Sequence, residues 1–228
     1  KISLNFAQNE LNNNIFIEKS LKSSKCTYNN KKISKKSLMF SFPCYSLVFG
    51  FNNILLNDST YRRDFLDSGM FHVEHDTQKL YTSFTKSLKQ RNFLLKSKKI
   101  SDINFWSEEL INSNQLLHDA RLNYFNLLNK EFIATLESLK REMPKIYDEI
   151  SSIELTYTKG WDGNYKDQLN SNLTKDRSLG FTSIGTHRSD IKVTSKGELV
   201  KESGSMSTLV LSCLIMYLAK IKTFHVKH

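Results

Sequence analysis

The stretch YRRDFLDSGMFHVE, residues 61–74, lies where the character of the chain changes. From residue 60 to about residue 140 there is no proline and a single glycine, Gly69. Apolar side chains recur at helical spacing through this region, first at Leu80, Phe84 and Leu88 and then at Leu110, Leu117 and Tyr124. The stretch therefore opens a helical region in a chain whose two ends have a different pattern.

We expect two long helices here, over 77–99 and 105–143. Ser101 and Asp102 offer an N-cap to the second helix, and Pro144 stops it. The heptad spacing fails after Tyr124, because position 131 is Glu. The pattern predicts a short helical hairpin packed on a body, not a long free coiled coil.

The flanking regions are β-rich by their alternation. Ile2, Leu4 and Phe6 alternate with polar residues, and Asn29-Asn30 supplies a tight turn. An apolar stretch over 38–51 predicts a strand or two, and strands return at 153–157 and around a bend at 185–186 within 181–193. Residues 195–197 predict a hairpin turn, and helices are expected over 169–177 and 207–222. The plan is α/β, with an inserted helical arm.

Composition limits the class of protein. The 228 residues include 33 Lys and Arg against 23 Asp and Glu, a net charge of +10 that favours an anionic partner, nucleic acid or an acidic membrane surface. The three cysteines, Cys26, Cys44 and Cys213, form no disulfide or CxxC pattern, which favours a reducing cytoplasm. The longest apolar run, 209–219, is shorter than the roughly 20 residues that span a bilayer, so we expect a core helix and no membrane partner.

Several motifs, in one order, resemble the RecF family. Residues 61–74 match its RRxFLDxGxFHxE pattern, residues 88–92 read LKQRN, and Gly160-Trp161 matches its GW. Residues 176–190, DRSLGFTSIGTHRSD, match DRxxGxTxxGPHRxD except that Thr186 replaces the proline. In a segment before residue 61, Cys44 follows Pro43 where the family has an acidic residue. The resemblance covers about residues 40–220.

The resemblance implies a partial ABC-type ATPase head of α/β class with an inserted helical arm. It divides the chain into a β-rich part of the head (1–59), the arm (60–148) and a return to the head (149–228). A relative of this kind would be an ATP-dependent homodimer and a weak DNA-dependent ATPase. It would recognise gapped or junction DNA and act with RecO and RecR to place RecA, in repair, replication restart and the SOS response.

The phosphate-binding motifs of such an ATPase are missing from the sequence. A P-loop needs GxxxxGK[ST], but Thr186 and His187 follow the spaced glycines Gly180 and Gly185. No apolar strand ends in a Walker B Asp. We therefore expect an internal piece of a longer protein that binds ATP and Mg²⁺ when complete, and no cofactor on the chain as it stands.

One ATPase element is matched in part. The family pattern SRGQxK corresponds to Ser203, Gly204 and Ser205, followed by Met-Ser-Thr, with the Gln and Lys lost. This signature-like segment opens the last helix, whose N-terminus favours an anion such as a phosphate. A Ser-rich cap on a core helix is the equal alternative.

Two basic stretches could contact DNA phosphates without sequence preference. One contains no acidic residue and holds Lys86, Lys89, Arg91, Lys96, Lys98 and Lys99; the other holds Lys19, Lys22, Lys25, Lys31, Lys32, Lys35 and Lys36. His187 and Arg188 follow a bend and could present cationic donors to phosphate. Solvated surface is the alternative for each lysine. A non-catalytic basic DNA- or protein-interaction module, without nucleotide binding, is the competing function.

Other motif residues are expected to be structural. Arg62 and Arg63 stand beside Asp64 and Asp67 and could form ion pairs that orient the loop. Trp161 is expected in the core. His72 and His75 are three residues apart, but no third ligand stands at useful spacing, so no metal site is predicted, and a metal hydrolase is a remote alternative.

Overall fold

The computed structural model describes residues 1–8, 11–20, 23–34, 37–38, 53–74, 76–97 and 102–227. Contacts divide the chain into two compact units, residues 1–47 and 48–228. The predicted division at residues 59 and 148 concerns functional lobes and remains a prediction. The strands predicted over 38–51 lie, apart from Leu38, outside the described residues.

The first unit contains an antiparallel sheet in the order β1 (Ile2–Gln8), β2 (Leu11–Lys19), β3 (Ser24–Tyr28) and β4 (Lys31–Lys32). Asn29 and Asn30 have φ of 48° and 63°, which confirms the tight turn between β3 and β4. Ile15, Cys26 and Leu38 form the buried cluster of this unit. The alternation of its apolar residues correctly predicted the strands.

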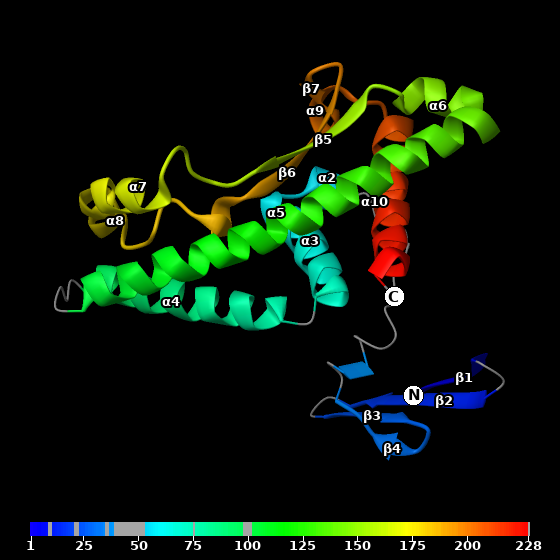
Figure 1. Cartoon of the computed structure of the whole chain (residues 1–228), viewed down its shortest axis with the longest axis horizontal. Coiled ribbons are helices and arrows are strands. Elements are labelled where there is room, and N and C mark those ends of the chain that lie inside the picture. Colours follow the sequence, from blue (N-terminus) through cyan, green and yellow to red (C-terminus); the bar gives the residue numbers. More distant parts are fainter. Residues whose placement is uncertain are drawn as a thin grey trace. The chain divides into compact units, whose positions relative to one another are not determined.

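The second unit carries the remaining elements, shown in Figure 1. In chain order they are α2 (Asn53–Leu56), α3 (Ser59–Val73), α4 (Thr77–Ser97), α5 (Ile103–Glu142), α6 (Pro144–Ile150), β5 (Ile153–Thr158), α7 (Tyr165–Ser171), α8 (Leu173–Leu179), the 3-10 turn η1 (Thr186–Arg188), β6 (Asp190–Ser195), β7 (Glu198–Leu199), α9 (Val200–Ser203) and α10 (Met206–Lys227).

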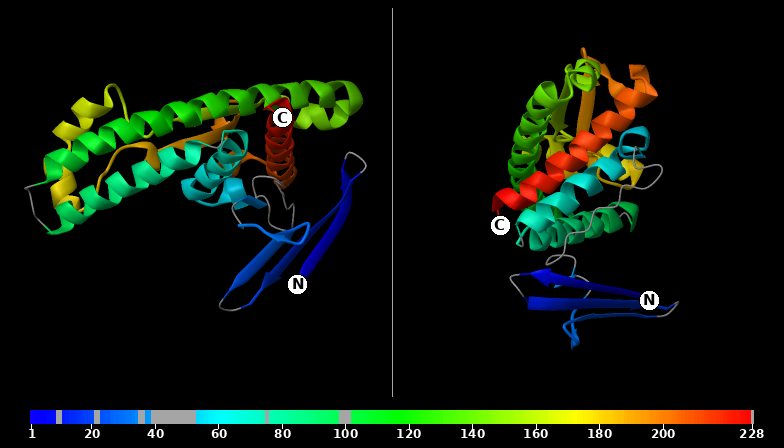
Figure 2. Two further views of the ribbon diagram at one scale, coloured as in Figure 1. Left: turned by 60° about the horizontal axis from the view of Figure 1, so that its bottom comes forward. Right: turned by 90° about the vertical axis from the view of Figure 1, so that its right-hand side faces the viewer.

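Helix α5 is the centre of this unit. It has 40 residues, and α3, α4, α6, α10 and β5 all pack against it (Figures 1 and 2). The buried face of α5 continues without interruption from Leu110 through Leu128 to Leu136. The predicted hairpin of α4 and α5 is therefore confirmed, and its second arm is one unbroken helix, as expected over 105–143.

The ends of these helices follow from local sequence. Asp58 caps α3 by accepting a hydrogen bond from the Thr60 N–H at 2.7 Å, which lowers the pKa of its carboxyl group. Pro144 stands at the start of α6 and ends α5, as expected. Asp102 precedes α5, but its side chain makes no capping hydrogen bond. The region expected as one helix over 169–177 contains two, α7 and α8.

Strands β5, β6 and β7 form an antiparallel sheet in that order, with Ile153 opposite Ser195 and Leu155 opposite Val193. Lys196 and Gly197, at φ of 52° and 85°, make the predicted hairpin turn. The strands predicted over 181–189 were wrong, because this segment contains only η1 and irregular chain. Its polar groups are instead hydrogen-bonded to α4 and α5, as described below.

Gly69 allows α3 to approach α5 closely. A methyl group at this position would overlap the ring and hydroxyl of Tyr124 on α5. Tyr124 is itself buried, and its hydroxyl lies 3.2 Å from the Thr223 hydroxyl on α10. The single glycine of the helical region is thus required by packing of three helices.

Helix α10 is long and apolar enough to cross a membrane by length and composition. However, Cys213, Met216 and Ala219 are completely buried, and the helix packs against α3, α5 and α6. The arrangement is that of a core helix, as the sequence predicted.

Candidate nucleic-acid interface

The motif residues meet in a buried polar framework whose centre is the ion pair of Asp67 on α3 with Arg121 on α5. The Asp67 carboxylate accepts from Nε and Nη2 of Arg121 at 2.7 and 2.8 Å. Nη1 of Arg121 donates to the Thr186 carbonyl at 2.7 Å and to Ser189 Oγ at 3.1 Å. Although burial opposes the charge, the Asp67 carboxylate raises the pKa of Arg121. The pair ties two helices to the 186–189 segment.

The neighbouring arginines of α3 bind the same region of the chain. Arg62 makes a two-bond contact to Asp190 at 2.7 and 3.0 Å and donates to the Asn57 carbonyl at 2.8 Å. Arg63 donates to the Ser189 carbonyl at 2.9 Å. Arg62 therefore forms a structural ion pair, as expected, but its partner is Asp190 and not Asp64 or Asp67, and Arg63 donates to neutral oxygens. Both side chains thus join the start of α3 to the 189–190 segment, 126 and 128 residues further along the chain.

Arg91 is buried, which corrects its assignment as a DNA contact. Its side chain is 1% exposed, and its Nη1 donates to Asp176 at 2.8 Å and to Thr182 Oγ1 at 2.7 Å. Asn92 Oδ1 accepts from the Thr182 N–H at 2.8 Å. The LKQRN motif therefore holds the segment after α8 against α4.

His187 is also corrected as a cationic donor to phosphate. Its Nε2 lies 3.0 Å from the Thr182 carbonyl, and burial lowers the pKa of the imidazole to about 4. The ring is therefore neutral at neutral pH. Arg188, the next residue, remains exposed, with its guanidinium 5.6 Å from the centre of the Phe181 ring. It stays a candidate DNA contact.

Two essential members of the framework, Arg121 and Asn114, were not singled out from the sequence. Asn114 Oδ1 accepts from the Thr186 N–H at 2.7 Å and from its hydroxyl at 2.6 Å. Both residues stand on the apolar face of α5, in register with the buried Leu110 and Leu117. A polar side chain at a helical core position was the available signal.

The exposed face of α4 is a basic stripe, which we define as Lys79, Lys86, Lys89, Phe93 and Lys96. These positions follow helical spacing, and α4 contains no acidic residue. Lys79 pairs with Asp76 at 2.8 Å, and Lys86 reaches over the Trp106 ring at 5.9 Å. Phe93 is 62% exposed in the middle of the stripe. From Lys86 to Lys96 the stripe extends about 15 Å along the helix.

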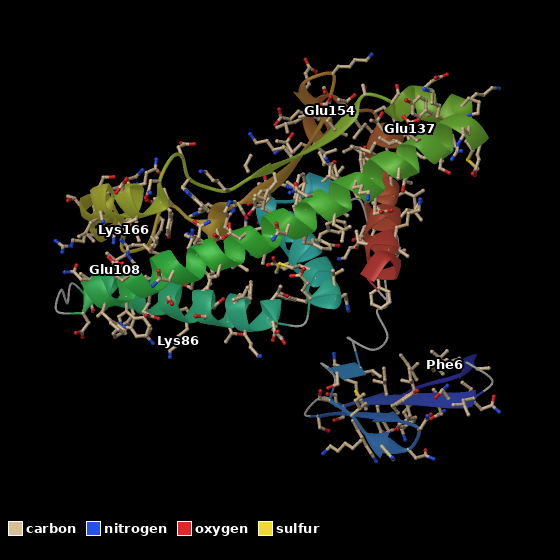
Figure 3. All side chains as sticks on the ribbon, viewed as in Figure 1. Phe6, Lys86, Glu108, Glu137, Glu154 and Lys166 are labelled. Atoms are coloured by element: carbon tan, nitrogen blue, oxygen red, sulfur yellow. The ribbon has the colours of Figure 1, made fainter. Side chains whose placement is uncertain are left out.

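The outer face of α5 has the opposite charge. Glu108, Glu109 and Asp119 are exposed, Glu108 and Asp119 lie about three turns apart on one face, and from residue 103 to 129 the helix carries no lysine. Glu108 lies beside Lys166 of α7 at 3.1 Å (Figure 3). Of the two helices of the hairpin, α4 therefore carries the positive charge that attracts phosphates.

The signature-like segment connects α9 to α10. Ser203 ends α9, Gly204 follows, and Ser205 Oγ accepts from the Thr208 N–H at 3.1 Å. Ser205 therefore caps α10, which supports the capping interpretation. Gly180 and Gly185 do not form a phosphate loop. Gly180 ends α8 in the left-handed region, and the Gly185 N–H is bound to the Gly160 carbonyl at 3.2 Å.

No group of three or more His, Cys, Asp and Glu side chains that could hold a metal ion occurs within the described ranges. His75 lies outside them. Trp161 is 7% exposed and belongs to the main core cluster.

Comparisons with known proteins agree with this architecture. No protein-family model matches the chain. The chain is 34% identical over 182 residues to the DNA replication and repair protein RecF of Pseudoalteromonas translucida, covering 78% of this chain and 45% of that protein. It is 36% identical over 169 residues to RecF of Hahella chejuensis, covering 71% and 44%. The chain thus spans about half the length of the curated relatives it matches.

Solved structures show the same fold. The recombination mediator protein RecF-ATPrS of the RecFOR pathway superposes with a TM-score of 0.77 at 18% identity, covering 96% of this chain and 62% of that one. The RecF-ATP structure gives a TM-score of 0.76, with 92% and 59% covered. The fold is accordingly that of part of a RecF ATPase head, mixed helix and sheet. By sequence over most of its length, and by fold, the chain is RecF-like.

Proposed function

We propose that this chain is the DNA-contacting portion of a RecF-like repair and replication factor and that the basic stripe of α4 contacts the DNA backbone. The observation that carries the proposal is the charge division of the hairpin, with exposed lysines on α4 and exposed acids on α5. Backbone contacts by lysine need no base sequence and depend strongly on salt. Arg188 is a further candidate contact.

The test compares two triple variants of the chain. Lys86→Gln, Lys89→Gln and Lys96→Gln remove three charges of the stripe, whereas Lys130→Gln, Lys175→Gln and Lys192→Gln remove three exposed charges elsewhere. The slope of log affinity against log salt should fall by about 3 in the stripe variant, since each phosphate contact contributes roughly 0.9. Equal loss of duplex affinity in both triples would contradict the stripe as the interface.

For the intact protein we propose recognition of gapped or junction DNA, together with action beside RecO and RecR to place RecA. The motif resemblance and the RecF relatives support this. Binding should be tighter to gapped duplex than to continuous duplex of equal length. Equal affinity for the two substrates would count against gap recognition.

The intact protein is also proposed to bind ATP with Mg²⁺ between two copies, as RecF-ATP is named for its nucleotide. Of the described residues, Ser203, Gly204 and Ser205 would face the nucleotide, at the N-terminus of α10. This chain supplies helix-terminal N–H groups there, but neither the Gln nor the Lys of the family pattern. Bound ATP would place its γ-phosphate near this helix end, and the complete ATPase head would hydrolyse it.

The altered signature favours one other function, a DNA- or protein-interaction module without nucleotide dependence. Measuring the DNA affinity of the intact protein with and without ATP distinguishes the ATPase from the interaction module. An ATP-dependent change in DNA affinity supports the ATPase, and identical affinity with and without ATP supports the module.

A further inference from the structure

A cavity lies beside α5, and none of the residues of the basic stripe lines it. It has a volume of about 740 Å³ and lies between α5, the end of β5, the 159–162 loop and α7. Figure 1 shows α7 and α8 beside the N-terminal half of α5, where this loop leaves β5. Sites for small organic ligands commonly have volumes of about 300–1,000 Å³.

Aromatic rings form one wall of the cavity. His118 stacks on Tyr157 with centroids 5.8 Å apart and an interplanar angle of 18°, and it meets Trp161 edge-on at 4.9 Å. The Trp161 ring also lies 5.1 Å from the Tyr165 ring, and Lys159 Nζ lies 5.2 Å from its centroid. These contacts fix the rings before any ligand arrives, which lowers the entropic cost of binding.

Uncommitted hydrogen-bonding groups line the rest of the cavity. Gln168 Oε1 accepts from the Asp162 N–H at 3.2 Å, which leaves the Gln168 amide NH₂ available. The half-buried Asn172 side chain makes no hydrogen bond to the described residues. The lining therefore offers both donors and acceptors beside the aromatic rings.

The charge of the lining argues against a simple phosphate site. Lys159 and Asp162 are its two charged residues and balance each other, and Lys159 already donates to the Gly163 carbonyl at 3.1 Å. Burial, opposed in part by Asp119, lowers the pKa of His118, so the imidazole adds no charge near neutral pH. Selectivity must come from shape and hydrogen bonds.

We propose that this cavity binds a nucleobase, with its ring against the wall of His118, Tyr157 and Trp161 and its edge hydrogen-bonded by Gln168 and Asn172. Side-chain amides pair with the mixed donor and acceptor edges of bases, and aromatic side chains pack against base faces. The base comes either from a free nucleoside or nucleotide or from an unpaired position of single-stranded DNA. The site does not depend on the α4 interface.

Fluorescence of Trp161 provides the test. Trp106 is the other of the two tryptophans, so Trp106→Phe leaves Trp161 as the sole reporter in the full chain. We would titrate the four deoxynucleosides, a single-stranded oligonucleotide and an abasic oligonucleotide of equal length. We expect a saturable fluorescence change with base-bearing probes only. A response to nucleosides identifies a free-nucleotide site, and a response to the base-bearing strand alone identifies unpaired DNA.

Variants test the edge contacts. Asn172→Ala should weaken base binding roughly tenfold, whereas Lys166→Ala, an exposed change on α7 outside the lining, should not alter it. Calorimetry on the chain with both tryptophans gives the same comparison if Trp106→Phe perturbs folding. A response to no base-bearing probe, an equal response to the abasic strand, or unchanged affinity in a folded Asn172→Ala variant overturns the proposal. The triple variant of α4 should retain nucleoside binding, so failure of the duplex interface would be seen separately.

Discussion

At the scale of single residues, three arginines, Arg62, Arg91 and Arg121, are buried and bind aspartates on distant segments instead of facing solvent. Asp67 with Arg121, Arg91 with Asp176, and Arg62 with Asp190 each join segments at least 54 residues apart. A buried pair adds little net stability over a well-packed apolar pair, but loss of one partner leaves an uncompensated charge. These pairs therefore specify which segments meet.

Replacing Asp67 with Leu should lower the free energy of unfolding by about 3–5 kcal/mol, because Arg121 would remain buried without its counter-charge. The double variant Asp67→Leu, Arg121→Met should recover much of that loss. Urea unfolding of the single and double variants measures the loss and the recovery of unfolding free energy. Additive losses in the double variant would show that the two residues act independently.

Lys220 makes the free energy of unfolding depend on pH. It is 3% exposed on α10 and donates to the Phe65 carbonyl at 2.8 Å and to Ser68 Oγ at 2.6 Å. Burial lowers its pKa from 10.5 to about 7 in the folded chain. Between these values the unfolded chain binds more protons, so the free energy of unfolding rises with pH above 7 and falls as pH drops through 7.

The difference in unfolding free energy between the unaltered chain and Lys220→Met should therefore increase by about 2 kcal/mol from pH 7 to pH 9. Urea unfolding at both pH values gives the measurement. Lys89→Met, at an exposed position, serves as the control and should show no such trend. A pH-independent difference for Lys220→Met would contradict a depressed pKa.

At the scale of elements, Gly69 determines how closely α3 can pack on α5. Gly69→Ala should destabilise the chain by about 1–3 kcal/mol, because the added methyl group overlaps Tyr124. Ser83→Ala, on the exposed face of α4, should change stability by less than about 0.5 kcal/mol. Thermal unfolding checks both, and recovery in Gly69→Ala with Tyr124→Leu would assign the cost to this contact.

The sequence predicted the elements whose periodicity is local. The alternation of Ile2, Leu4 and Phe6 identified a strand, and the spacing of Leu110 and Leu117 identified α5. It did not predict the 181–189 segment, where Thr182 and Thr186 are held by Asn92 and Asn114. Those hydrogen bonds cross 72–90 residues and override the local β pattern.

The candidate site was predictable to a similar extent. Lysine spacing without acids indicated the stripe of α4, and Lys86 and Lys89 are exposed as that required. The burial of Arg91 within the same run depends on Asp176, whose position only the tertiary fold supplies. A run of basic residues does not reveal which of them the fold will bury.

At the scale of the whole molecule, the described residues of this chain lack the groups that hydrolyse ATP. Gly180 ends α8, and the Gly185 N–H is hydrogen-bonded to the Gly160 carbonyl. Thr186 and His187 stand where a phosphate loop has Lys and Ser or Thr. We expect no steady release of phosphate from ATP and Mg²⁺ by the purified chain, with or without DNA. A coupled phosphate assay measures this, and turnover that copurifies with the chain through successive columns would contradict it.

The length of α5 has a mechanical consequence. Residues 103–142 contain neither proline nor glycine, so this helix, about 60 Å long, has no built-in hinge. One half of it is clamped to α4, and the other half packs on α6 and α10. We expect a displacement of α4, which carries the basic stripe, to tilt α5 as one rod and to reach α10, which α5 contacts at Thr223 and Lys222. We therefore expect α5 to couple the surface proposed to hold DNA to the helix that follows the signature-like segment.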